Sequence, residues 1–105
     1  MTKLVVVLAL VAACTSASST GITSASLTCD TTLTYDNFGS AFFENNCLSC
    51  HATQEQPRLT TQAAIQSNAS RILDEAVYTT AMPQDADIAT AERQMLGDWL
   101  VCGAP

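Results

Sequence analysis

The chain has 105 residues, with ten carboxylates, four basic side chains and a formal charge of −6. This length allows one small domain, and the absence of a basic patch argues against a nucleic-acid partner. Five cysteines accompany a single histidine, His51, so the informative chemistry is that of thiols and one imidazole.

The N-terminal segment has the pattern of an export signal. Lys3 precedes a short apolar run, residues 4–11, which ends in small residues before Cys14. The run is shorter than the roughly 20 residues that span a bilayer. The sequence VAAC resembles a bacterial lipobox, so we expect residues 1–13 to be removed and Cys14 to carry lipid. The chain would then be a membrane-anchored lipoprotein on the exported, periplasmic or cell-surface side. An ordinary signal peptide cleaved nearby is the alternative.

Residues 14–28 are expected to be a flexible tether, because nine of the fourteen residues from 15 to 28 are Ser or Thr. The folded unit is expected to comprise residues 29–105. A chain that begins at Cys14 keeps three arginines against ten carboxylates, a formal charge of −7. Any protein partner of such an acidic domain is expected to dock through a basic or neutral face of its own. A domain this small usually needs a disulfide, a metal or a cofactor for stability.

His51 directly follows a CxxC pair, Cys47 and Cys50, in the stretch NNCLSCHATQ. Structural zinc needs four ligands, usually two such pairs, and no second pair exists. A thioredoxin-type CxxC follows a strand in a βαβ pattern, which residues 30–105 lack. Covalent haem needs two thiols one helical turn apart and an imidazole directly behind them. We therefore expect one haem c per chain, with thioether bonds to both cysteines and His51 as the proximal iron ligand.

The opposite face of the iron needs a soft, neutral ligand. There is no second histidine, and Lys3 leaves with the signal, so Met82 and Met95 remain. Met82 precedes Pro83, which keeps its backbone extended and out of a helix. Met95 falls in an apolar helical stripe, where core packing is expected. Met82 is therefore the predicted distal ligand; the alternative is a loop methionine that touches the haem without bonding the iron.

The remaining cysteines, Cys29 and Cys102, allow one disulfide in an exported protein. Two free buried thiols are the alternative. Arg58 and Arg71 are candidate partners of the haem propionates, although exposed arginines are more often simply solvated.

The apolar periodicity predicts an all-α domain of about four short helices and no strand. The first helix is expected to be capped by Asp36 and to run into Cys47. The last is expected to be capped by Thr90 and to end near Cys102. The stretches TTQAAIQS and SRILDEAVYTT are predicted to form two short helices between them.

These features together resemble the signature of small bacterial class I c-type cytochromes; they are Gly39, Phe43, Cys47, Cys50, His51, Met82-Pro83 and Leu96-x-x-Trp99. The likeness covers about residues 35–102, and its specific part is CxxCH with a Met-Pro further on. It implies the cytochrome c fold, in which the first and last helices cross, here at Gly39 and Trp99.

Two departures from the family pattern concern the ligands. Only 31 positions separate His51 from Met82, fewer than is usual in the family, which implies shortened loops and a more exposed haem edge. The proline whose carbonyl takes the proximal imidazole N–H usually lies further on, and Pro57 is the candidate here.

The resemblance implies an electron carrier whose partners are other redox proteins. With both axial positions filled, neither a small-molecule substrate nor catalysis is expected. The alternative is a haem enzyme or gas sensor with an open distal site. A structural lipoprotein with a haem-free CxxC is the third possibility.

Overall fold

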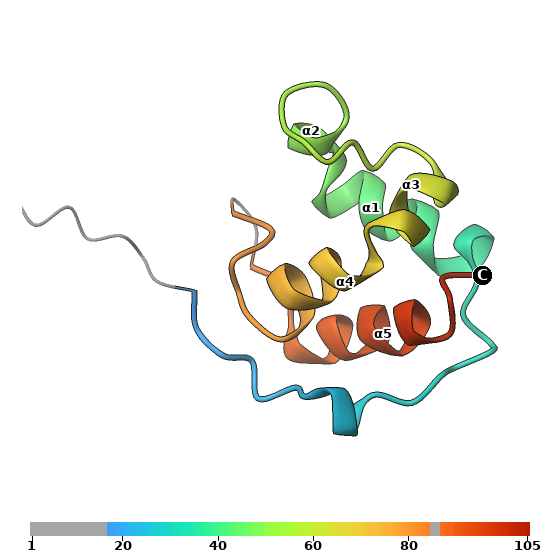
Figure 1. Ribbon diagram of the computed structural model, residues 1–105, viewed down its shortest axis with the longest axis vertical. Coiled ribbons are helices and arrows are strands. Elements are labelled where there is room, and N and C mark those ends of the chain that lie inside the picture. The colour runs from blue at the N-terminus through green and yellow to red at the C-terminus, as the bar shows by residue number, and fades with distance from the viewer. Residues whose placement is uncertain (1–16, 85–86) are drawn as a thin grey trace, which may run out of the picture.

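The computed structural model describes residues 17–84 and 87–105 and is all-α, with no strand in that part of the chain (Figure 1). In chain order the elements are the 3₁₀ turn η1 (Ser24–Ser26), the π-helix η2 (Tyr35–Gly39), α1 (Ser40–Asn46), α2 (Leu48–His51), α3 (Gln62–Ser67), α4 (Ala69–Ile72), the π-helix η3 (Leu73–Val77) and α5 (Thr90–Val101). The predicted all-α class is confirmed. The elements beyond the expected four helices are η1 and α2, of which α2 is a single turn that follows the break at Cys47.

The first helix begins with a reciprocal cap rather than at the expected Asp36. The side-chain oxygen of Thr34 accepts a hydrogen bond from the Asn37 amide at 3.1 Å. In return, the Thr34 amide donates to the side-chain oxygen of Asn37 at 2.7 Å. Two otherwise unpaired helix-start donors are satisfied in this way. Asp36 lies inside the first turn, where its carboxylate faces the positive end of the helix.

The middle of the chain forms helices where they were expected. TTQAAIQS contains α3, whose first turn is capped by the Thr61 hydroxyl as it accepts from the Ala64 amide at 3.1 Å. SRILDEAVYTT contains most of α4 and the η3 turn that continues it. Ile65, Ile72 and Val77 are buried in the core. These helices therefore form one wall of the interior.

The first and last helical segments meet where Gly39 faces Trp99. A Cβ atom at Gly39 would lie 2.6 Å from two carbons of the Trp99 ring. The indole is fully buried, and its ring centroid lies 5.9 Å from that of Phe38 and 6.2 Å from that of Phe43. The missing side chain of Gly39 thus lets the indole lie directly on the helix backbone. The predicted contact between these two residues is present.

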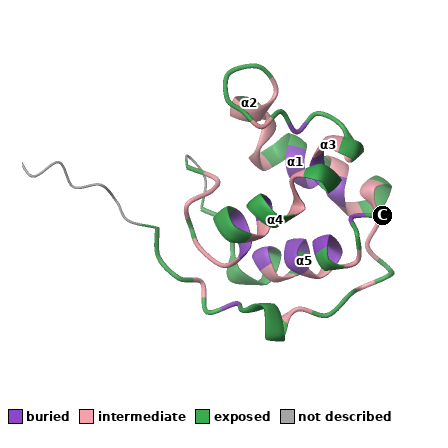
Figure 2. Ribbon diagram, in the orientation of Figure 1, coloured by how far each residue is buried: buried purple, intermediate pink, exposed green. Residues whose placement is uncertain are grey.

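Helix α5 buries one face, which is purple in Figure 2; its buried residues are Arg93, Leu96, Gly97, Trp99 and Leu100. Met95 was predicted to pack with them, but 41% of its surface is exposed, so that prediction is wrong. Successive residues of an α-helix are about 100° apart, and Met95 therefore turns away from the face that carries Leu96 and Leu100.

The ends of α5 differ in how well they were predicted. Thr90 is the first helical residue and not the cap; Ala89 precedes it and makes no side-chain cap bond. Glu92 lies in the first turn, where its charge favours the positive helix end. The helix ends at Val101, close to the expected Cys102. Gly103 follows with a φ of +93°, a conformation that suits glycine after a helix.

Residues 17–28 do not form the flexible tether that their composition predicted. Ile22 is buried, and a Cβ on Gly97 of α5 would lie 2.5 Å from the Leu27 side chain. The Thr20 amide donates to the Tyr78 carbonyl at 3.0 Å, and Ser19 and Thr79 form an isolated antiparallel bridge. Two apolar anchors in a polar segment are enough to dock it, and its hydroxyls bond backbone groups. The folded unit therefore begins before residue 29.

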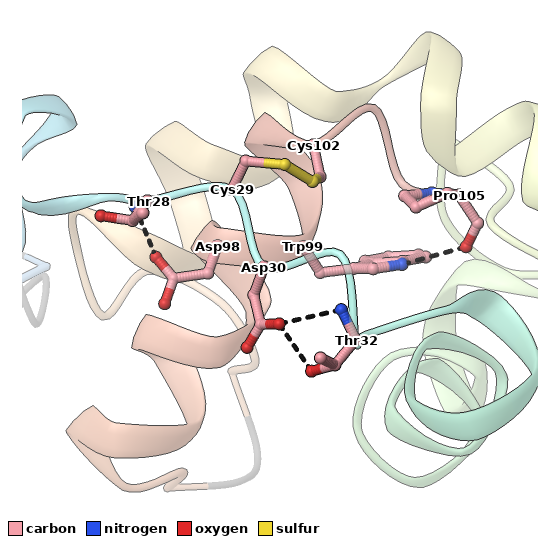
Figure 3. Close-up of a disulfide and its surroundings, with 8 residues drawn as sticks. All are labelled: Thr28, Cys29, Asp30, Thr32, Asp98, Trp99, Cys102 and Pro105. Atoms are coloured by element: carbon pink, nitrogen blue, oxygen red, sulfur yellow. Dashed lines mark hydrogen bonds between the residues drawn. A yellow bond between two sulfur atoms is a disulfide. The ribbon is translucent and has the colours of Figure 1, made fainter.

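Cys29 and Cys102 form the predicted disulfide beside the end of α5, with Cα atoms 4.6 Å apart (Figure 3). The Thr28 amide donates to the Asp98 carboxylate at 2.9 Å, next to this bond. On the other side of the helix end, the Trp99 indole N–H donates to the Pro105 carbonyl at 3.2 Å. Both the N-terminal segment and the last residues are thus attached to α5.

Gly39→Ala should destabilise the fold, because the added methyl would overlap a Trp99 ring that is packed between two phenylalanines. Overpacking of this kind costs about 1–3 kcal/mol. Urea unfolding monitored by circular dichroism measures the change. Ala41→Ser, an exposed change in the adjoining helix, is the matched control and should leave the midpoint almost unchanged. Equal midpoints for Gly39→Ala and wild type would refute the close contact.

Replacing both Cys29 and Cys102 with serine should lower the free energy of unfolding. The bond closes a sequence separation of 73, for which the chain-entropy model gives about 4 kcal/mol. Denaturant unfolding of the wild type with and without reductant, beside the double variant, measures this loss. Reductant should destabilise the wild type and leave the variant unaffected. Two alkylatable thiols at these positions in the native protein would contradict the pairing.

Candidate functional site

The CxxCH motif comprises the break at Cys47 after α1 and the single helical turn α2 that follows it. The Cys47 amide still donates to Phe43 of α1 at 2.9 Å, but its own φ of −125° interrupts the helix. The carbonyl of Cys47 then accepts from the amides of Cys50 and His51, at 3.3 and 2.9 Å. All three side chains line one cavity of about 450 Å³. The local spacing therefore delivers both thiols and the imidazole to the same space.

The imidazole of His51 is oriented by the backbone. Its Nδ1 lies 2.8 Å from the Pro57 carbonyl oxygen. Because a carbonyl can only accept, Nδ1 carries the hydrogen, and in the neutral imidazole Nε2 then keeps its lone pair. The His51 carbonyl also accepts from the Leu59 amide at 2.9 Å, so the loop after α2 folds back on the motif. The structure brings Pro57 to the position expected of the partner of His51, which leaves Nε2 ready to bind a metal.

A second cavity of about 280 Å³ shares part of its lining with the first. Its wall includes the apolar side chains Phe43, Leu59, Ile72, Ala76 and Leu96. Cys47, His51, Gln56 and Met82 line both cavities. Most of the residues that border the larger space are polar, and they come from the end of α1, the CxxCH motif, the loop after it and the Met82 segment. A ligand with an apolar body and some polar groups would match this pair of cavities.

Met82 reaches this site from a distant part of the chain. It is partly buried and packs on the core, and its amide donates to the Glu75 carbonyl at 2.7 Å. Pro83 follows it and also lines the larger cavity. Met95, on the exposed side of α5, borders neither cavity. The structure thus brings Met82 together with His51 and does not do so for the other candidate thioether.

The two candidate arginines differ in position. Arg71 is exposed but borders the second cavity, where it remains available to a ligand carboxylate. Arg58 borders neither cavity, and its Nη1 donates to the Ala52 carbonyl at 3.4 Å. Only Arg71 is therefore placed to meet an acidic group of a ligand.

One of the two thiols, Cys47, is poorly suited to redox exchange. Cys47 and Cys50 are free, and burial raises the pKa of the Cys47 thiol to about 12. Exchange between dithiol and disulfide proceeds through a thiolate, which Cys47 does not supply near neutral pH. Nor do three or more His, Cys, Asp or Glu side chains gather as a metal-ion site anywhere in residues 17–84 or 87–105. A structural zinc ion would lack its four ligands there.

One residue of the site was missed by sequence reasoning. Arg93 of α5 is 3% exposed, and its Nη1 donates to the carbonyls of Ala76 and Met82, both at 2.7 Å, and of Thr79 at 3.3 Å. Burial lowers the pKa of this arginine, and Asp87 acts in the opposite direction. The available signal was its position three residues before Leu96, on the buried face of the helix.

No family model, curated protein or solved structure matches the chain. None of the helices in the described ranges has the length and apolar character that spanning a bilayer requires. Cys14, the expected lipidation site, and the expected signal lie outside the described residues.

Proposed function

We propose that this chain is a mono-haem c-type cytochrome that carries electrons. The observation that carries the proposal is the meeting of Cys47, Cys50, His51 and Met82 at one pair of adjoining cavities. These are the four groups that covalent haem with His/Met ligation requires. The all-α bundle and the packing of Trp99 on Gly39 agree with the class I cytochrome arrangement.

The residues at the site fit a covalently bound haem. The larger cavity, of about 450 Å³, is in the range of small-molecule sites, and the smaller one, of about 280 Å³, adjoins it. The smaller one offers apolar walls for the macrocycle, and Arg71 at its border is available for a propionate. His51, with Nδ1 held by Pro57, offers Nε2 to the iron.

Each part of the site then has a task. Cys47 and Cys50 would hold the haem through thioether bonds, with the sulfur and hydrogen of each thiol added across one vinyl group. His51 and Met82 would both bind the iron and so leave no place for a substrate. The bound haem supplies an iron that cycles between Fe(II) and Fe(III). Phe43, Leu96 and the other apolar lining residues keep water away from it.

The acidic charge supports a redox partner with a basic or neutral docking face. The chain from Cys14 onward has a formal charge of −7, and opposite charge on a partner would speed their encounter. We also propose that lipid on Cys14 anchors the protein on the exported side of a membrane.

Met82→Ala should separate the electron carrier from a haem enzyme or sensor. In wild-type protein from a host that performs c-type maturation, haem should stay on the polypeptide after acid and solvent extraction. Met82→Ala should then remove the Met–Fe(III) charge-transfer band, lower the potential and allow carbon monoxide to bind, since thioether ligation favours Fe(II). Met95→Ala, the matched exposed methionine, should retain the band. A wild type that lacks the band and binds carbon monoxide readily has an open distal site, and the carrier assignment then fails.

Cys14→Ser should release the protein from membranes or block its processing. Lipid is the proposed attachment, and stable anchoring needs more than a single acyl chain. Cell fractionation followed by immunoblotting measures the membrane-bound share. Ser16→Ala, two residues away, should remain attached. If the Cys14 variant stays in the membrane fraction as fully as the wild type, lipidation is not the anchor.

A further inference from the structure

The segment that carries Met82 is bonded to the rest of the molecule mainly through backbone groups. The Met82 amide donates to Glu75, and its carbonyl accepts from Arg93, with both distances at 2.7 Å. Residues 79–84 have no helix of their own to stiffen them. The direction of the Met82 side chain therefore depends on what holds its peptide.

Arg93 holds this segment at three successive points. Its Nη1 meets a carbonyl in η3, at Ala76, a second in the following turn, at Thr79, and a third at Met82. The two short bonds lead to the first and last of these. A nearly buried cation also strengthens each bond to a carbonyl dipole. Arg93 thus links the last helix to the segment of the candidate distal ligand.

The planar guanidinium is suited to this task. All three bonds come from one nitrogen, Nη1, whose two N–H groups are held in the plane of the guanidinium, whereas the ammonium of the shorter lysine side chain is a point charge that rotates freely. Methionine has an unbranched side chain with three rotatable bonds, so it aims at one place only when its backbone is fixed. Loss of the planar guanidinium should therefore change the position of the thioether more than the stability of the overall fold.

We propose that Arg93 is a positioning residue that fixes the Met82 peptide so that its thioether faces His51 across the cavity. This inference rests on the proposed His/Met ligation. Arg93 does not touch the iron; it acts through the backbone of the ligand residue. Without Arg93, Met82 should compete less well with added ligands for the iron.

Arg93→Lys tests the geometry of the hydrogen bonds, because it keeps the positive charge and loses the planar guanidinium. Arg93→Gln removes the charge as well. Both should weaken the Met–Fe(III) band and raise the affinity of the oxidised protein for imidazole by about tenfold or more, as expected when hydrogen bonds to a charged group are lost. Arg93→Gln should also lower the potential further than Arg93→Lys. Arg58→Lys and Arg58→Gln, at an arginine that borders neither cavity, should match the wild type in the band and in imidazole affinity.

Thr20→Val controls for general destabilisation. It removes a hydroxyl that donates to the Val77 carbonyl in η3 at 2.6 Å and to the Tyr78 carbonyl at 3.2 Å, and neither bond involves Arg93 or Met82. It should lower the unfolding midpoint but leave imidazole affinity unchanged. If the Arg93 variants lose stability as Thr20→Val does, yet keep the wild-type band and imidazole affinity, Arg93 is only structural and the proposal is overturned.

Amide hydrogen exchange keeps the test independent of the ligation. In the reduced wild type the Met82 amide should be strongly protected, and in Arg93→Lys it should exchange at least about tenfold faster, while the Leu100 amide in α5 changes little. An unprotected Met82 amide in the wild type would overturn the proposal even if no Arg93 variant folds. If the wild type lacks the Met–Fe(III) band, the proposed ligation fails, but the exchange of the Met82 amide can still be measured. Failure of the proposed function and failure of the Arg93 proposal are therefore distinguishable.

Discussion

The packing of Trp99 against the backbone at Gly39 determines how the beginning and end of the helical bundle meet. From Gly39 the helix continues through α1 to Cys47, which opens the CxxCH turn. From Trp99, α5 leads back less than two turns to Arg93, which holds the carbonyl of Met82. One contact therefore orients both halves of the candidate site. A side chain inserted at Gly39 would change the distance between those halves as well as the stability of the fold.

The parts of the site that the sequence predicted are those with a local signal. Two cysteines and a histidine within five positions occupy a single turn, so their convergence needs no knowledge of the fold. Pro57 is six residues from His51, within reach of a loop that folds back once. The disulfide followed from elimination, because the other cysteines already had tasks. Met82 was placed by elimination as well, and it does border the cavities, although its bond to iron is still a proposal.

The features that the sequence did not predict depend on tertiary contacts. Arg93 bonds backbone carbonyls, which every residue possesses, so no pattern of side chains marks its partners. Met95 is exposed although its neighbour Leu96 is buried. Hydrophobicity alone does not show where the buried face of a helix ends. In the Ser/Thr-rich segment, the polar composition as a whole predicted a tether, although it includes two apolar residues that pack, Ile22 and Leu27. These two side chains find partners on helices far along the chain.

That N-terminal segment also has a consequence for the order in which the molecule assembles. Its long-range bonds join Thr20 to Val77, Thr28 to Asp98 and Cys29 to Cys102, at separations of 57, 70 and 73 positions. Contacts so distant in sequence are slow to form, because the entropy of closing the intervening chain must first be overcome. The helices between them have local partners and can form earlier. During synthesis, residues 20–29 leave the ribosome before the helices do and are thus the last of these segments to reach their places in the structure.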